Sequence, residues 1–183
     1  MDREDWIAAA RWLENNQPCG DVTPMEEFDP KQERHKGHWY VVATYPVGSN
    51  LKGKCISQHF RPQEDGSVKL LTKVVEVKTE KIRTYKGTAK FVENEAKFIE
   101  IYEDVEYEEE WILDTDYENY AIHFACADLS PYKVNNVWIL AKTTSVEEEV
   151  LKKAHKVLRD NKLSIETLEV VDCESCPKEK KKY

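Results

Sequence analysis

The sequence predicts an all-β protein, an eight-stranded up-and-down antiparallel β-barrel with one α-helix packed on its outside. Two observations support the barrel: eight short segments rich in Val, Ile, Tyr, Phe and Thr, and turn residues that separate them at hairpin distances. A third observation is a single amphipathic helix pattern after the last segment. Closure into a barrel is expected because it removes the exposed edges that an open meander would leave.

The strands are expected in an unbroken series. Turn residues occupy the joints, as in Glu64-Asp65-Gly66 and Ser130-Pro131. The expected strands cover residues 39–46, 54–61, 67–77, 81–92, 95–102, 105–114, 119–126 and 135–143.

The expected helix follows the eighth strand in the segment SVEEEVLKKAHKVLRDN. Ser145 and Glu148 have the spacing of a capping box, and the acidic first turn and basic last turns suit the helix dipole. Its apolar stripe needs an apolar surface, and the outside of the barrel is the surface that remains. The stripe consists of Val146, Val150, Ala154, Val157 and Leu158.

Length and composition fit a single domain. The chain has 183 residues, 40% of them hydrophobic, and a formal net charge of -8, which argues against nucleic acid as a partner. No apolar stretch approaches the roughly 18 residues that span a bilayer, so no membrane insertion is expected. Residues 1–18 are interpreted as an N-terminal extension, helical over 2–15, residues 19–176 as barrel and helix, and 177–183 as a basic tail.

The five cysteines predict an oxidising environment. Cys173 and Cys176 form a CxxC pair, but it lies in a polar tail, and no second CxxC or close histidine pair completes a zinc site. Two disulfides that tie both termini to the body, with one thiol left over, fit the pattern better. The sequence therefore predicts a secreted, extracellular protein.

Several motifs together resemble the lipocalin family. Gly37-His38-Trp39 is similar to its first signature, Thr115-Asp116-Tyr117 with Tyr120 to its second, and Lys142 stands where the family has an arginine. The resemblance covers roughly residues 19–176. It is nearest to arthropod members, the insect bilin-binding proteins, the insecticyanins and the crustacean pigment carriers, through GHWYVVATYP, GKCISQHFRP, YKGTAKF, TDYENY and VWIL in their expected order.

The resemblance implies structural roles for these residues. Gly37 and Trp39 would begin the barrel, with Trp39 sealing its floor and Lys142 lying over the indole. Thr115, Asp116 and Tyr117 would shape the turn between the sixth and seventh strands. The resemblance also implies disulfides from Cys19 to Cys126 and from Cys55 to either Cys173 or Cys176.

Strand alternation then indicates which side chains face the ligand. If Cys126 and Cys55 point outward, their neighbours of opposite parity point inward. Counting from Trp39 and Lys142 extends the set to the first and eighth strands, and the resemblance supplies the third, fourth and fifth. The predicted lining is Ala43, Tyr45, Gln58, Leu70, Thr72, Val74, Tyr85, Gly87, Ile99, Ile101, His123, Ala125, Asn136, Trp138 and Leu140.

The sixth strand, VEYEEEWIL, allows two registers. Apolar alternation favours Tyr107, Trp111 and Leu113 as inward, whereas the family resemblance favours Glu106, Glu108, Glu110 and Ile112. The two differ by one residue and reverse every side chain. Inward glutamates would favour a ligand with a positive charge, such as an amine, whereas outward glutamates would form a solvated face.

The predicted function is an extracellular carrier that binds a small hydrophobic molecule inside the barrel, most readily a pigment such as the bilin biliverdin. The alternatives are a carotenoid or other lipid carrier, and a salivary-type lipocalin that scavenges a biogenic amine or inhibits a host protein through its loops. No required cofactor, metal or catalytic residue is expected, because no nucleophile, base and orienting partner come together. The bound chromophore would be biliverdin or a carotenoid, in a monomer or homo-oligomer.

Overall fold

The computed structural model describes residues 22–29, 31, 37–45, 53–102, 105–129 and 132–176. The predicted helix over residues 2–15, Cys19 and the basic tail 177–183 lie outside these ranges. Within the part of the chain that is described, no helix is long and apolar enough to cross a membrane.

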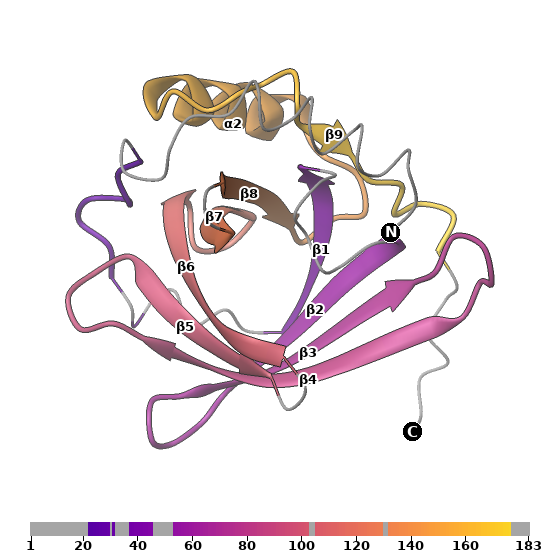
Figure 1. Cartoon of the computed structure of the whole chain (residues 1–183), viewed down its shortest axis with the longest axis horizontal. Coiled ribbons are helices and arrows are strands. Elements are labelled where there is room, and N and C mark those ends of the chain that lie inside the picture. Colours follow the sequence, from indigo (N-terminus) through magenta and orange to yellow (C-terminus); the bar gives the residue numbers. More distant parts are fainter. Residues whose placement is uncertain are drawn as a thin grey trace.

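Eight antiparallel strands close into a barrel, as predicted (Figure 1). Each strand from β2 to β7 pairs with the next, and β1 pairs with both β8 and β2, which closes the barrel. A two-residue ninth strand joins the outside of β1. The strands are β1 (Gly37–Thr44), β2 (Lys54–Pro62), β3 (Val68–Val75), β4 (Ile82–Phe91), β5 (Lys97–Tyr102), β6 (Val105–Thr115), β7 (Tyr120–Leu129), β8 (Tyr132–Ala141) and β9 (Glu169–Val170).

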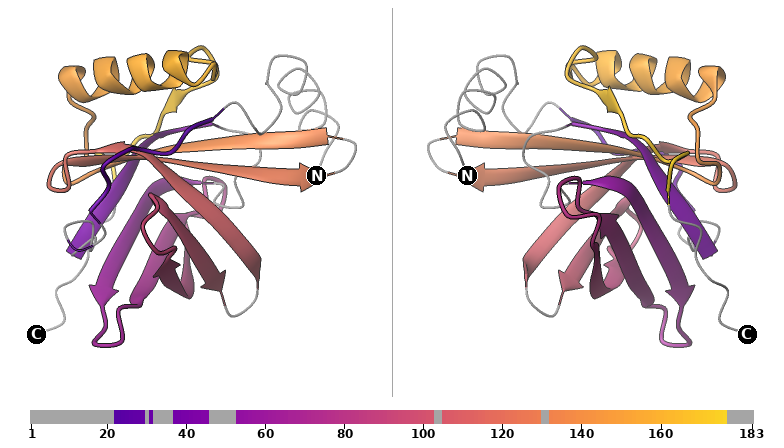
Figure 2. Two further views of the ribbon diagram at one scale, coloured as in Figure 1. Left: turned by 90° about the vertical axis from the view of Figure 1, so that its left-hand side faces the viewer. Right: turned by 90° about the vertical axis from the view of Figure 1, so that its right-hand side faces the viewer.

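The hairpin of β7 and β8 is longer than the sequence suggested. The expected strands ended at residue 126 and resumed at residue 135, but β7 continues to Leu129 and β8 begins at Tyr132. Leu129 pairs directly with Tyr132, so the pairing of the two strands continues to their ends. The two orange strands accordingly extend together beyond the rest of the barrel in Figure 2.

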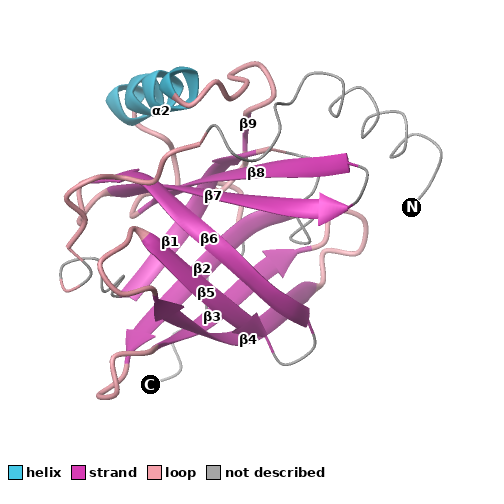
Figure 3. Ribbon diagram, turned by 60° about the vertical axis from the view of Figure 1, so that its left-hand side comes forward, coloured by secondary structure: helices cyan, strands magenta, loops and turns pink. Residues whose placement is uncertain are grey.

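Helix α2 (Glu148–Asp160) lies against the outside of the barrel, as expected (Figure 3). Ala154 and Leu158 are fully buried among outward-facing side chains of β7 and β8, and Val146, Val150 and Val157 pack around them. The expected capping box is wrong, because the helix begins at Glu148 after an N-cap at Glu147 that makes no side-chain cap bond. Burial of the apolar stripe therefore outweighs the cap in holding this helix.

Two apolar clusters divide the core. The inner cluster fills the barrel around Trp39, Phe60 and Phe98, and the outer cluster fills the layer between the barrel wall and α2 around Phe124 and Leu158. On β7, Ala121 belongs to the inner cluster. The strands β7 and β8 thus have apolar side chains on both faces, whereas on β2 to β5 mainly the inner face is apolar.

One end of the barrel is closed. Trp39 is buried, and the Lys142 ammonium lies 4.2 Å from the centroid of its ring, which confirms the predicted stacking. The segment before β1 adds to this floor, since Met25 and Phe28 pack on the inner cluster. The Phe28 ring contacts the rings of Phe91 and Tyr117, so this segment covers the closed end.

The turn between β6 and β7 has the predicted structural role. An Asp116 carboxylate oxygen accepts hydrogen bonds from the backbone N–H groups of Glu118, Asn119 and Tyr120. These bonds lower the pKa of Asp116, against the effect of burial. The Thr115 hydroxyl donates to the Tyr120 carbonyl, which fixes the turn from the other side.

The disulfide framework resolves the cysteine ambiguity. Cys55 is bonded to Cys176, and Cys173 is a buried free thiol whose Sγ lies 3.3 Å from the carbonyl oxygen of Val41. Burial, together with the charge of Asp172, raises the pKa of the Cys173 thiol to about 11. Cys126 is also disulfide-bonded, and its predicted partner Cys19 lies outside the described residues.

Candidate functional site

Much of the predicted lining faces the inside of the barrel. The strand pairings place these residues on one continuous inner surface, because directly opposed residues share a face. Leu70 is opposite Gly87, Thr72 is opposite Tyr85, and His123 is opposite Trp138. The inward residues that were predicted are Gln58, Leu70, Thr72, Val74, Tyr85, Gly87, His123, Ala125, Asn136, Trp138 and Leu140.

The prediction for Ala43 and Tyr45 is wrong. The register between β1 and β8 shifts between Val41 and Ala43, so Val41 is opposite the inward Leu140 but Ala43 is opposite the outward Ile139. The extra residue of this bulge reverses the alternation along the rest of the strand. Ala43 and Tyr45 therefore belong to the outer cluster.

Tyr45 has a structural role in the outer layer. Its side chain leaves the barrel, and its hydroxyl donates a hydrogen bond of 2.5 Å to the carbonyl oxygen of Ser164, beyond α2. Burial raises the pKa of this phenol well above its usual value. Tyr45 thus ties the end of β1 to the segment that follows the helix.

The prediction for Ile99 and Ile101 is also wrong. On β5 the inward residues are Phe98 and Glu100, which are 1% and 2% exposed, whereas Ile101 is 50% exposed. Ile101 is opposite Thr88 on the outer face of β4. The segment KFIEIY carries apolar side chains at both parities, so its pattern does not determine which face is buried.

On the sixth strand the structure selects the register that the family resemblance favoured. Glu110 and Ile112 are buried inside, and Leu113 belongs to the outer cluster. Trp111 is half-buried outside, where it contacts the Phe124 ring and where the Lys97 ammonium lies 4.6 Å from its centroid. The side chains of Glu106, Tyr107 and Glu108 lie outside the described part of the structure.

Two buried carboxylates therefore face the interior. The Tyr102 hydroxyl donates to a Glu100 carboxylate oxygen at 2.8 Å. His123 Nδ1 lies 3.2 Å from a carboxylate oxygen of Glu110, and when Glu110 is ionised the ring donates from Nδ1, because an ionised carboxylate only accepts. We call these four residues, Glu100, Tyr102, Glu110 and His123, the acidic cluster.

Burial and neighbouring charges shift the pKa values of Tyr102 and His123 in the acidic cluster. The pKa of the Tyr102 phenol is raised first by burial and then by the charges of both Glu100 and Glu110. Burial lowers the pKa of His123 to about 3, so its imidazole is neutral at neutral pH. The hydrogen-bond donors that Tyr102 and His123 supply to the two carboxylates thus carry no positive charge.

Gly87 makes room for Tyr102 inside the barrel. Tyr102 is opposite Gly87, and a side chain at Gly87 would come within 2.9 Å of the Tyr102 ring. The ring therefore lies in the space that the glycine leaves open. Which residue of β5 lies opposite Gly87 depends on the strand pairing, so the sequence alone does not place Glu100 and Tyr102.

Neutral polar groups extend the acidic cluster around the wall. Gln58 Nε2 lies 3.4 Å from the Thr72 hydroxyl, which makes a weak hydrogen bond inside the barrel. The Trp138 indole N–H is buried and has no hydrogen-bond partner among the described residues. A ligand with a hydrogen-bond acceptor beside Trp138 would satisfy this donor. The site combines aromatic walls, two carboxylates and neutral donors.

The buried imidazole predicts a pH-dependent stability. In the unfolded chain His123 takes up a proton near its ordinary pKa of 6.5, but in the folded protein only near 3. The contribution of the neutral His123 ring to the free energy of unfolding is therefore fully present above pH 6.5. It falls as the pH drops from 6.5 toward 3, by up to about 1.4 kcal/mol per pH unit. Urea unfolding followed by circular dichroism at pH 7 and pH 4.5 measures it.

His123→Gln is the matched variant, because its amide can still donate to Glu110. We expect its unfolding free energy to lose clearly less than that of the wild type between the two pH values. An equal loss in both proteins would assign the acid sensitivity to other groups.

A closed barrel with an inward-facing set of aromatic and polar side chains defines a class of protein, the binding proteins that hold a small molecule inside a β-barrel. The model of the lipocalin / cytosolic fatty-acid binding protein family matches residues 36–172. The chain belongs to this family. Rat (Rattus norvegicus) apolipoprotein D is 31% identical over 170 residues, which cover 87% of this chain and 84% of that protein.

Solved structures share the fold. Insecticyanin from the tobacco hornworm Manduca sexta superimposes with a TM-score of 0.72 at 22% identity, covering 85% of this chain and 86% of that one. The amine binding protein of Rhodnius prolixus, in its tryptamine complex, has a TM-score of 0.68 at 20% identity, covering 84% and 86%. At these identities the two structures establish the common barrel.

Proposed function

We propose that the protein is a non-enzymatic extracellular carrier that binds a small, largely apolar molecule bearing a protonated amine inside its barrel. The observation that supports this is the acidic cluster, in which Glu100 and Glu110 are buried on the inner wall. Tyr102 and His123, their neighbours, supply neutral donors. An ammonium group is the ligand feature that such a wall favours most.

Burial increases the strength of this preference. A carboxylate inside a protein interacts with a cation through a lower effective dielectric than water provides, and it gains most from a cation that also donates hydrogen bonds. A primary ammonium offers three donors to the oxygens of Glu100 and Glu110. The aromatic wall at Tyr85 and Trp138 suits an aromatic body on the same ligand.

The extracellular setting is supported by the disulfide between Cys55 and Cys176. Disulfides persist in oxidising compartments and are rare in the cytosol. The amine-binding protein of Rhodnius prolixus has the same fold, so the barrel is compatible with such a ligand. The argument for an amine in this chain still depends on Glu100 and Glu110.

A pigment is the second candidate, supported by the motifs that resemble insect bilin-binding proteins. Biliverdin has pyrrole N–H groups that a buried carboxylate can accept, and flat rings that suit Tyr85 and Trp138. Its propionates, however, would be repelled by Glu100 and Glu110. Biliverdin or a carotenoid would have to bind with a shifted absorption band, which a titration followed by visible spectroscopy detects.

Calorimetric titration with tryptamine and with the uncharged 3-ethylindole tests the amine proposal. We expect tryptamine to bind more tightly, since only tryptamine carries a charge. Glu110→Gln should weaken tryptamine binding by at least roughly thirtyfold, as expected for the loss of one partner of a buried charge pair, and leave 3-ethylindole within about threefold.

Glu109→Gln is the matched control, because Glu109 is exposed on the outer face and accepts a hydrogen bond from the Trp111 indole, which glutamine also accepts. It should leave both affinities unchanged. Equal binding of tryptamine and 3-ethylindole, or an unchanged tryptamine affinity in Glu110→Gln, would overturn the proposal. Biliverdin binding in that case would favour the pigment.

A further inference from the structure

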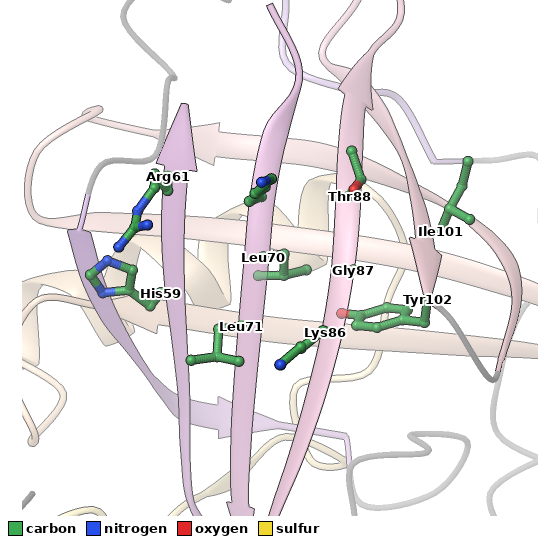
Figure 4. A pocket seen from close by; sticks show the side chains of 10 residues that line it. His59, Arg61, Leu70, Leu71, Lys86, Gly87, Thr88, Ile101 and Tyr102 are labelled. Atoms are coloured by element: carbon green, nitrogen blue, oxygen red, sulfur yellow. The ribbon is translucent and has the colours of Figure 1, made fainter. Parts of the chain in front are cut away.

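A groove of about 610 Å³ lies on the outer wall of the barrel, across β2, β3, β4 and β5 (Figure 4). Two rows of outward side chains line it. His59, Leu71 and Lys86 are opposed in the first row, and Arg61, Lys69, Thr88 and Ile101 in the second. Leu70, Gly87 and Tyr102, which face the interior, also line the groove, so its floor is the barrel wall itself.

The groove is basic in an acidic protein. The chain has a net charge of -8, yet Arg61, Lys69 and Lys86 all line the groove and are exposed. None of the described residues that line it is a carboxylate. The three cations lie on adjacent paired strands, so they converge on one region.

The groove also has apolar side chains. Ile101 on β5 is 50% exposed and Leu71 on β3 is half-buried, with β4 between them. Between the two rows lies Gly87, whose missing side chain would point inward, where the Tyr102 ring fills the space. An apolar body can therefore be buried against Leu71 and Ile101 while its charged end meets the cations.

We propose that this groove is a second ligand site, which binds an anionic amphiphile, a molecule with a phosphate, sulfate or carboxylate head and an apolar chain. The cations of Arg61, Lys69 and Lys86 match the head, and Leu71 and Ile101 match the chain. A volume of about 610 Å³ suits one small molecule. The ladder of hydrogen bonds from β2 to β5 holds the groove in place before the ligand arrives.

The two sites have opposite charge preferences. The interior presents Glu100 and Glu110, whereas the groove presents cations only, so an anion gains nothing from the interior. This difference allows the location of a bound anion to be tested by changing the charge of either site. The test does not depend on whether an amine binds inside.

Calorimetry with dodecyl phosphate below its critical micelle concentration is the test. We expect one molecule to bind per chain, and Lys69→Glu and Lys86→Glu each to weaken the affinity by about tenfold or more. Lys78→Glu, which makes the same charge change at an exposed turn between β3 and β4, should have little effect. Leu71→Ser should also weaken the binding of dodecyl phosphate. Inorganic phosphate has no chain to bury, so it should bind every variant far more weakly than dodecyl phosphate does.

Several results would overturn the proposal. If Glu110→Gln strengthens the binding of dodecyl phosphate, the anion enters the barrel. If Lys69→Glu and Lys86→Glu bind as the wild type does while circular dichroism shows them folded, the groove is not the site. If phosphatidylserine vesicles bind but monomeric dodecyl phosphate does not, the basic face contacts a membrane surface and does not hold a single amphiphile.

Discussion

Replacing both Cys55 and Cys176 with serine is expected to lower the free energy of unfolding by roughly 4 to 5 kcal/mol, because the bond closes a long loop in the unfolded chain. The two residues are 121 positions apart, so their bond restricts most of the unfolded chain. The arm that ends at Cys176 also contributes native contacts. The Val171 N–H donates to the Val42 carbonyl, and the Cys55 N–H to the Asp172 carbonyl.

Guanidinium unfolding followed by circular dichroism measures this loss, and hydrogen exchange at Val171 reports whether the arm is released. Cys173→Ser is the matched control, since it changes a cysteine of the same arm that forms no disulfide. We expect Cys173→Ser to lower the free energy of unfolding clearly less than the double variant does. An unchanged unfolding midpoint in the double variant would mean that backbone pairing alone holds the arm.

The sequence was most informative where one residue of known orientation fixed the alternation. Cys126 on β7 and Lys142 after β8 each define one parity, and every inward residue counted from them is inward in the structure. No bulge interrupts the pairing of these two strands. Continuous alternation between a fixed point and the site is therefore what made His123, Asn136 and Trp138 predictable.

The errors have two physical causes. On β1 the counting from Trp39 crossed a bulge at Val42, and a bulge leaves no clear mark in the run of small apolar residues VVAT. On β5 the side chains of both parities are apolar, so burial could not be inferred from hydrophobicity. Pairing between strands decides such cases, and a single sequence does not display it.

The acidic cluster is the part of the site that depended most on the fold. Burying a carboxylate is costly, so hydrophobic patterning argues against placing Glu100 and Glu110 inside. The barrel accommodates them because Tyr102 and His123 supply hydrogen bonds from the same face. Residues that contradict local patterning are frequently functional. Glu100 was not expected inside the barrel, whereas Glu110 is inward as the family resemblance implied.

Trp39→Ala is expected to lower the free energy of unfolding by about 3 to 5 kcal/mol, as for other large aromatic side chains removed from a core. Trp39 is 1% exposed and belongs to the inner cluster. Its removal would leave a cavity at the closed end beneath Lys142. Urea unfolding followed by circular dichroism measures the loss without depending on the fluorescence of the deleted indole.

Two further variants separate packing from the interaction between Lys142 and the ring. Trp39→Phe keeps an aromatic face and most of the volume, so it should cost markedly less than alanine. Lys142→Met removes the charge from a side chain that lies 4.2 Å from the ring centroid and should cost about 1 kcal/mol. Combining it with Trp39→Ala should add little more, because the partner ring is already gone. If the losses of unfolding free energy in the two single variants add in full in the double variant, Lys142 stabilises the barrel through other contacts. A loss below about 1 kcal/mol in Trp39→Ala would contradict the role of the indole as the floor.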